Sequence, residues 1–190
     1  MQLVFATHNA HKAEEVQAIL ANTGITVVTL ADLGFHTEVP ETGDTFVHNA
    51  LQKAHFVHAA TGLPCVADDS GLEVDGLGGA PGVHSKRFSP EATAEANNRL
   101  LLERLGPGAD RTARFRCVLA LVGVGKPRTV SGTCHGRIAE APSGGGGFGY
   151  DPLFLPDETS DRTMAQLSAH EKNAISHRGR AFSQLPGLLA

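Results

Sequence analysis

The stretch "LPCVADDSGLEVDGLGGAPG" at residues 63–82 decides the fold of this chain. It opens with a short apolar run that is typical of a buried strand, and this run leads directly into Asp68, Asp69 and Ser70. The following "GLEVDG", at residues 71–76, alternates between apolar and polar residues as a hairpin strand does, and glycines then open a loop. A buried strand closed by adjacent carboxylates indicates a sheet that carries polar chemistry at one strand end.

The residues before this stretch predict two strand-and-helix pairs. "QLVFA" at residues 2–6 and "ITVVTL" at residues 25–30 are expected to form short strands. Between them, apolar residues at helical spacing predict a helix that is closed by a glycine. A second helix is expected to begin after an N-cap at Asp44 or Thr45 and to end at Gly62.

The residues after this stretch predict a third helix and a long hairpin. The helix is expected to begin at Pro90, with Ser89 as its N-cap, and to stop at Gly106. "TARFRCVLALVGVG" at residues 112–125 and "RTVSGTCHGRIAE" at residues 128–140 are expected to pair as antiparallel strands.

A final helical region is expected at about residues 168–185. The combination of βα pairs with a long antiparallel hairpin indicates an α/β fold in which a long mixed sheet is flanked by helices. Because no clean linker interrupts the chain, we expect one domain over residues 1–190 that is divided into two lobes.

Composition limits the class of protein. The 190 residues carry 16 basic and 20 acidic side chains, and the net charge of −4 argues against broad binding to nucleic acid or membranes. The amino terminus shows neither a charged leader nor a long apolar stretch, so we expect a cytoplasmic protein. The three cysteines form no CxxC pair, and Cys65 and Cys117 lie in apolar runs as small core residues do.

"ATHNAHK" at residues 6–12 lies between the first strand and the first helix. Thr7 and Asn9 offer polar side chains, the helix start offers free N–H groups, and Lys12 adds a mobile charge, which together suit an anion. The alternative is an ordinary helix cap. A Walker loop is excluded because GxxxxGK[ST] is absent from the chain.

Asp68 and Asp69 are expected to point to opposite faces of their strand and so to differ in role. One can bind a hard cation or accept a proton, while the other forms local hydrogen bonds. Glu41, in an acidic loop, could complete a Mg²⁺ site, since Mg²⁺ usually takes one or two protein carboxylates. The alternative is that "DDSG" simply forms a turn.

"SGGGGFGYDP" at residues 143–152 formally contains GxGxxG, but no helix is expected to follow it, so a dinucleotide fingerprint is rejected. Phe148 and Tyr150 in such a glycine-rich loop suit stacking on a flat ring. The alternative is an aromatic core beside a flexible loop.

"HEKNAISHRGRAF" at residues 170–182 begins like HExxH, but residue 174 is alanine, so a zinc protease is excluded. Lys172, His177 and Arg178 cluster there as hydrogen-bond donors. The alternative is a solvated basic helix face.

Five blocks, in order over nearly the whole chain, together resemble the inosine/xanthosine triphosphate pyrophosphatases. They are "ATHNAHK", "ETGDTFVHNALQKA", "ADDSGLEVDGLGGAPGVHSKRFS", "GGFGYDPLF" and "EKNAISHRG". The chain departs from the family at His8, where a glycine is usual. The resemblance implies a strongly twisted mixed sheet with two lobes and a central cleft, usually in a homodimer. It also implies Mg²⁺-dependent hydrolysis of dITP, ITP and XTP to a monophosphate and pyrophosphate.

The resemblance also implies roles for the residues that match these blocks. The residues expected at the phosphates are Thr7, His8, Asn9, Ala10, His11, Lys12 and Lys53. Mg²⁺ is expected on Glu41 and Asp69, and Asp69 is also the expected general base. Ser70 is expected to touch the nucleotide, and the expected base pocket comprises Phe148, Gly149, Tyr150, Asp151, Lys172, His177 and Arg178.

Donor and acceptor positions can explain base selection. His177 and Arg178 can donate hydrogen bonds to the 6-oxo group of a purine. The amino group of adenine would instead leave a buried donor facing a donor, at a cost of about 1–3 kcal/mol. GTP also has a 6-oxo group, so its 2-position must be sensed sterically or by Asp151. Two alternatives are a related pyrophosphatase for pyrimidine or standard nucleotides and a nucleotide-binding module without turnover. The presence of both Glu41 and Asp69 disfavours the binding module.

Overall fold

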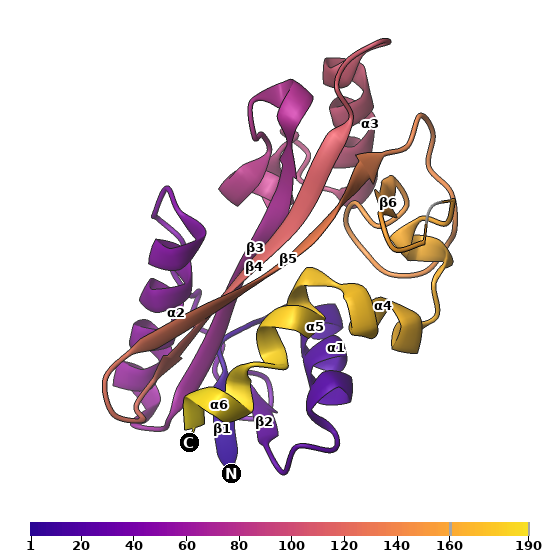
Figure 1. The fold of residues 1–190 in the computed structure, drawn as a ribbon. Helices are drawn as coiled ribbons and strands as arrows, with labels where there is room; N and C mark the ends of the chain where they lie inside the picture. Colours follow the sequence, from indigo (N-terminus) through magenta and orange to yellow (C-terminus); the bar gives the residue numbers. More distant parts are fainter. Residues whose placement is uncertain (160, 190) are drawn as a thin grey trace. The chain divides into compact units, whose positions relative to one another are not determined.

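The computed structural model describes residues 1–159 and 161–189 of the chain (Figure 1). In these residues, six strands are hydrogen-bonded into one sheet in the order β2-β1-β3-β4-β5-β6. β1 is parallel to β2 and β3, whereas β5 is antiparallel to β6, which confirms the predicted mixed sheet. The strands are β1 (Gln2–Phe5), β2 (Thr26–Thr29), β3 (Cys65–Val74), β4 (Thr112–Val122), β5 (Arg128–Ile138) and β6 (Phe154–Pro156).

Helices connect and flank the strands. The α-helices of the described residues are α1 (Ala10–Leu20), α2 (Phe46–Thr61), α3 (Ala94–Leu105), α4 (Ala169–Ile175), α5 (His177–Phe182) and α6 (Leu185–Leu189). Three short 3₁₀ helices accompany them, η1 (Asp75–Leu77), η2 (Gly82–Arg87) and η3 (Met164–Gln166). Among the described residues, no helix combines the length and the apolar composition that crossing a bilayer requires.

The chain folds as two compact units, each assembled from segments that are distant in sequence. Unit 1 comprises Met1–Asp69, Cys117–Gly132 and Arg178–Ala190, and unit 2 comprises Ser70–Arg116 and Thr133–His177. The boundaries fall within β3, β4 and β5 and at the start of α5, so each long strand contributes residues to both units. Each unit also has a hydrophobic core of its own.

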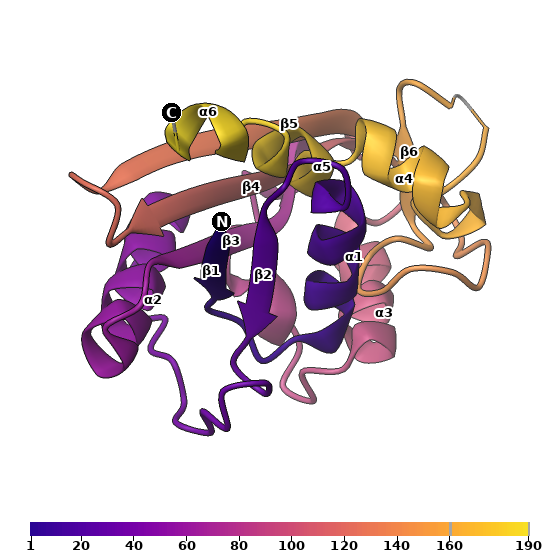
Figure 2. The same cartoon turned by 90° about the horizontal axis from the view of Figure 1, so that it is seen from below.

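In unit 1, side-chain caps set the start of both long helices. The Asn9 side chain accepts a hydrogen bond from the Lys12 N–H and begins α1, and the Thr45 side chain accepts one from the His48 N–H and begins α2. Gly62 ends α2 as expected, because its φ of 69° is left-handed and glycine adopts it without strain. Figure 2 shows α1 alongside β2 in this unit.

The core of unit 1 positions the junction between β1 and α1. β1 and β2 are in register with Leu3 opposite Val27, and the rings of Phe5 and Phe182 meet edge to face with centroids 5.5 Å apart. The buried side chains of α1 join the same cluster, as the helical spacing predicted: Ala13, Val16 and Leu20. Burying each large apolar side chain contributes about 1.5–3 kcal/mol, so the carboxyl end of β1 is held firmly against α1.

The core of unit 2 gathers around aromatic rings. The ring centroids of Phe115 and Phe154 lie 4.6 Å apart, and Tyr150 and Leu101 belong to the same buried cluster. β6 closes this unit by pairing with β5, with Leu155 opposite Arg137. This packing supports the loop that precedes β6.

The predicted start of the third helix was wrong. α3 begins at Ala94, and its N-cap is Thr93, whose side chain accepts from the Ala96 N–H. Ala92 has a φ of 52°, a left-handed conformation that interrupts any helix begun at Pro90. Gly106 ends α3 as predicted.

Two further features differ from the expectations. β3 runs unbroken over Cys65–Val74, so the apolar run and "GLEVDG" belong to one strand, and the alternative of a turn at "DDSG" is excluded. The final helical region consists of α4, α5 and α6, and the extended backbone of Ser176, with a ψ of 154°, separates the first two. Propensity alone did not reveal this interruption, because no glycine or proline marks it.

Candidate active site

Three segments of unit 1 converge on the carboxylate of Asp69. Lys53 lies on α2, and its Nζ donates to Asp69 Oδ1 at 3.1 Å and to Glu41 Oε1 at 2.5 Å. The acidic loop before α2 supplies Glu41, and β3 supplies Asp69. The structure therefore brings together these three residues, which the sequence separates by up to 28 positions (69 minus 41).

Burial and charge act on these groups in opposite senses. Burial alone would lower the pKa of Lys53, but the carboxylates of Asp69, Asp68 and Glu41 outweigh it and raise that pKa. Burial raises the pKa of Asp69, and the positive charge of Lys53 only partly offsets this effect. Asp69 therefore holds a proton more readily than an ordinary aspartate does.

Asp68 belongs to a second cluster of charges in unit 1. Lys12 Nζ donates to Asp68 Oδ2 at 3.0 Å, and Arg178 Nη2 donates to the same oxygen at 3.1 Å. Burial would raise the pKa of Asp68, but Lys12, Arg178 and Lys53 outweigh burial and hold the pKa well below its usual range. Asp68 therefore stays ionised as a fixed counter-charge, while its neighbour Asp69 is the more basic of the two.

Arg178 is one of the largest fully buried side chains of the described residues, with 1% of its surface exposed. Besides Asp68, its Nη1 donates to Glu15 Oε2 at 2.7 Å. These partners lie in unit 1, whereas Lys172 and His177, with which Arg178 was expected to form a base pocket, lie in unit 2. A role for Arg178 at the base stays a prediction.

The turn between β1 and α1 carries the remaining residues predicted at the phosphates. Thr7 Oγ1 accepts from the Asn9 N–H at 3.2 Å, and Ala10 is the first residue of α1. His8 Nε2 lies 3.0 Å from the Thr37 carbonyl oxygen, and His11 is exposed beside Glu14. Asn9 serves as a helix cap, which was the alternative for this segment, and the same geometry leaves Lys12 at the first turn of α1.

Unit 2 holds the loop that precedes β6. Asp151 Oδ2 accepts from the Phe148 N–H at 2.7 Å and from Lys172 Nζ at 2.6 Å. Lys172 Nζ also lies 4.8 Å from the centroid of the Phe148 ring, within the range of a cation–π interaction. Gly149 is tied to α3, because Asn98 Nδ2 donates to its carbonyl oxygen at 3.0 Å. The structure thus groups four of the residues predicted for the base.

Tyr150 and His177 are held by packing in the same unit. The Tyr150 hydroxyl donates to the Ser85 carbonyl oxygen at 2.9 Å, and its ring belongs to the core. The His177 ring stacks on Phe115 with centroids 4.7 Å apart. Tyr150 is therefore a core residue, which was the alternative for this loop, and stacking of Phe148 on a flat ligand stays a prediction. Ser70 lies in β3 directly after Asp69 and is half-buried.

The donor set around Lys53 fits Mg²⁺. Glu41 and Asp69 direct carboxylate oxygens at one cationic atom, Lys53 Nζ, so two hard oxygen ligands already converge around a positive charge. Mg²⁺ prefers one or two carboxylates and completes its octahedron with waters and phosphate oxygens. Glu41 and Asp69 are therefore the residues that would hold it.

Sequence reasoning missed two residues that these clusters use. Asn49 donates to Asp69 Oδ2 at 3.1 Å, and Glu15 binds Arg178. Each lies one helical turn from a predicted residue, Asn49 from Lys53 and Glu15 from Lys12, so residues three or four apart share a helix face. This helical spacing from Lys53 and Lys12 could have identified Asn49 and Glu15 from the sequence.

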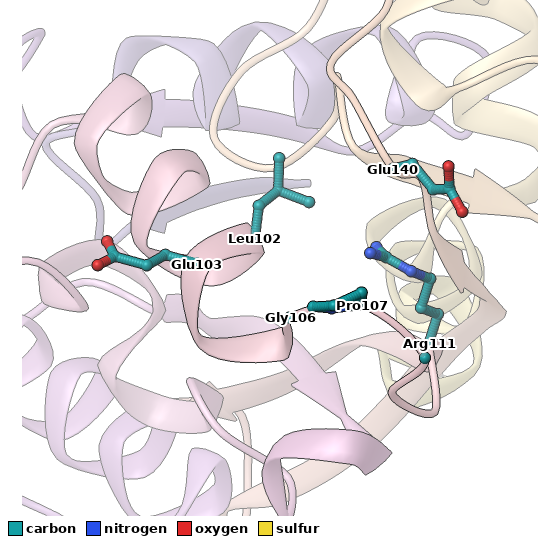
Figure 3. A pocket seen from close by; sticks show the side chains of 7 residues that line it. Leu102, Glu103, Gly106, Pro107, Arg111 and Glu140 are labelled. Atoms are coloured by element: carbon teal, nitrogen blue, oxygen red, sulfur yellow. The ribbon is translucent and has the colours of Figure 1, made fainter.

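A surface pocket of unit 2 lies elsewhere, at the end of α3 (Figure 3). Figure 3 shows Arg111 and Glu140 on one side of it and Glu103 on the other. Arg111 donates to the carbonyl oxygen of Ala139 at 3.0 Å. None of the residues that line it was predicted for the site: Leu102, Glu103, Gly106, Pro107, Gly108, Arg111 and Glu140.

The mixed sheet flanked by helices, with Glu41 and Asp69 around Lys53, defines an α/β protein with a cluster of charged side chains at one strand. The model of the Ham1 family matches residues 3–187, and the chain therefore belongs to the Ham1 family. Its sequence is 51% identical to a dITP/XTP pyrophosphatase of Geobacter sulfurreducens over 97% of this chain and 94% of that protein. It is 46% identical to a dITP/XTP pyrophosphatase of Bacillus subtilis over 99% and 96% of the two chains.

Solved structures agree with this assignment. A HAM1 protein from Coxiella burnetii is 40% identical in sequence and superposes with a TM-score of 0.88. The match covers 100% of this chain and 98% of that protein. The structure titled a nucleoside-triphosphatase and dITP/XTP pyrophosphatase from Mycobacterium abscessus is 44% identical, with a TM-score of 0.76 and coverage of 97% and 98%. These comparisons confirm both the resemblance and the fold class.

Proposed function

We propose that this chain hydrolyses the non-standard purine nucleoside triphosphates dITP, ITP and XTP to a monophosphate and pyrophosphate, and so cleanses the nucleotide pool. The observation that carries the proposal is the grouping of Asp69, Glu41 and Lys53 in unit 1. Relatives 43–51% identical over nearly their full length have the name dITP/XTP pyrophosphatase, which supports the same substrate class here.

The residues of unit 1 suit the phosphates and the attacking water. Asp69 takes a proton from the water, and Lys12 and Lys53 offset the negative charge that builds up around phosphorus. When bound on Glu41 and Asp69, Mg²⁺ would neutralise further phosphate charge in the transition state. Asp68 keeps Lys12 in place at the first turn of α1.

The residues of unit 2 suit the base. Phe148 offers a ring for stacking, and Lys172 stands over that ring while bound to Asp151. A donor such as Lys172 or His177 donates a hydrogen bond to the 6-oxo group of hypoxanthine or xanthine and disfavours the amino group of adenine by about 1–3 kcal/mol. Gly149, held by Asn98, completes the loop that presents Phe148.

The setting of the reaction is part of the proposal. We expect a homodimer, as the family resemblance implies. We also expect a cytoplasmic protein without nucleic acid or membrane partners, which the net charge of −4 suits. The three cysteines are buried, as small core residues of a reducing compartment are. Light scattering during gel filtration should give about twice the chain mass of 19.9 kDa, and a mass of one chain would contradict the dimer.

A substrate panel tests the activity directly. Pyrophosphate release is measured with Mg²⁺ for ITP, dITP, XTP, GTP, ATP, dTTP and dUTP. We expect the first three to react at least tenfold faster in kcat/KM, the equivalent of about 1.4 kcal/mol of discrimination. Equal turnover of the purine nucleotides would contradict the selectivity, and preference for dTTP or dUTP would assign the chain to pyrimidine nucleotides.

Asp69→Asn separates an enzyme from a binding module. The amide keeps the size of the side chain but cannot take the proton of water, so hydrolysis should be abolished while ITP binding, followed by calorimetry, persists. A variant that turns over at the wild-type rate would exclude Asp69 as the base.

A further inference from the structure

Asn49 is a buried polar residue of unit 1. It is 1% exposed and lies on α2 one turn before Lys53. Its Nδ2 donates to Asp69 Oδ2 at 3.1 Å, and its Oδ1 accepts from the Gly43 N–H at 2.7 Å. The amide orientation follows from these partners, since a backbone N–H only donates and an ionised carboxylate only accepts.

Asn49 and Lys53 together hold both oxygens of Asp69. Lys53 contacts Oδ1 and Asn49 contacts Oδ2, each at 3.1 Å, from the same face of α2. Lys53 brings a positive charge, whereas Asn49 brings a neutral donor. The neutral donor restricts the rotation of the carboxylate without placing a second positive charge beside it.

The same two residues also hold the acidic loop. Lys53 contacts Glu41, and Asn49 contacts Gly43. The loop approaches α2 closely at this point, because a Cβ on Gly43 would lie 2.6 Å from Cγ of His48. One amide thus connects the expected base with the loop that carries the other carboxylate.

We propose that Asn49 is a positioning residue for the hydrolysis, which orients Asp69 by one hydrogen bond and ties the loop of Glu41 to α2 by the other. The inference rests on the proposed function. It adds the residue that fixes the position of the Asp69 carboxylate relative to the loop that carries Glu41. Groups that orient a catalytic carboxylate typically contribute about 10- to 100-fold to activity.

Gln52 provides a matched control on the same helix. Its Oε1 accepts from the Thr42 N–H at 2.9 Å, and its Nε2 donates to Thr42 Oγ1 at 2.8 Å. It therefore holds the neighbouring residue of the same loop with two hydrogen bonds, and both of them go to Thr42 and not to Asp69. Gln52→Ala loosens the loop while leaving the Asp69 contact in place.

Asn49→Asp separates the two contacts of Asn49 itself. The new carboxylate can still accept from the Gly43 N–H, but while it is ionised it has no donor for Asp69 and repels the charge of Asp69. We expect kcat for ITP to fall by about 10- to 100-fold with a much smaller change in KM. Hydrogen exchange at the Gly43 amide should remain as slow as in the wild type. Gln52→Ala should have the opposite effects. Hydrogen exchange in the loop should become faster, while kcat stays within about threefold of the wild type.

The outcomes distinguish this inference from the proposed function. A wild-type chain that releases no pyrophosphate from ITP, dITP or XTP defeats the proposed function. An active wild type together with an Asn49→Asp variant of unchanged kcat defeats the positioning role. Where Asn49→Asp does not fold, Asn49→Ala takes its place and must lower kcat by at least tenfold. A Gln52→Ala variant with the same loss of kcat would show that general loosening of the loop is the cause, and would overturn the inference.

Discussion

Asp68→Asn tests the charge cluster of unit 1. In the folded chain this carboxylate is 1% exposed and neutralises Lys12 and Arg178, whose side chains are 16% and 2% exposed. Asparagine preserves the volume but removes the charge, which leaves a buried guanidinium with Glu15 as its nearest remaining counter-charge. Removing one partner from a buried ion pair costs about 3–5 kcal/mol, so the free energy of unfolding should fall by that amount.

The loss should be large enough to measure in two ways. For a chain of this size a change of 1 kcal/mol shifts Tm by about 2–4 °C, so Tm should fall by about 6–20 °C. Urea denaturation followed by far-ultraviolet circular dichroism gives the free energy itself. Glu91→Gln is the control, because the ion pair of Glu91 with Arg99 is 3.7 Å long and exposed on both sides, and such pairs contribute about 0–1 kcal/mol.

The stability difference between the wild type and Asp68→Asn should depend on pH in a definite direction. The pKa of Asp68 is lower in the folded chain than its usual 3.8, so its contribution to stability is complete above pH 3.8 and is lost as the pH falls toward the folded value. The difference in free energy of unfolding between the wild type and Asp68→Asn should therefore become smaller at acidic pH. An Asp68→Asn variant no less stable at pH 7 than Glu91→Gln would refute the reasoning.

Three further predictions concern unit 2. Lys172→Met should raise KM for ITP about tenfold and lower kcat less, because Lys172 is bound to Asp151 at the predicted base pocket and not at the phosphates; a pure loss of kcat would contradict this. Tyr150→Phe should lower the free energy of unfolding by about 1 kcal/mol, since the hydroxyl loses its bond to the Ser85 carbonyl, and an unchanged urea midpoint would exclude that contribution. Glu171 has a pKa lowered to about 2, chiefly by the backbone N–H at the start of α4, so its stabilising effect is complete above pH 4.5 and is lost as the pH falls toward 2. Melting curves of Glu171→Gln should therefore differ from the wild type at pH 7 and converge with it near pH 2, and a difference that is independent of pH would exclude this linkage.

Local patterns in the sequence determined most of the secondary structure. The cap at Thr45, the stop at Gly62 and the strand at residues 2–5 follow from neighbouring residues, because capping, left-handed glycine and apolar runs act over a few positions. The start of α3 at Ala94 did not follow from such patterns. There the left-handed Ala92 and the bond from the Ser89 N–H to Asn97 Oδ1 override the preference of proline for a first helical turn.

The family and the set of candidate residues also followed from the amino-acid order alone, since ordered motifs are a property of the chain. Which charges meet followed only from the folded arrangement of the chain. Asp68 and Asp69 are adjacent in sequence, yet one is held by Lys12 and Arg178 and the other by Lys53 and Asn49. Their pKa values move in opposite directions because Coulomb interactions and burial depend on distances through space, which β3, α1 and α2 set and which no spacing along the chain contains.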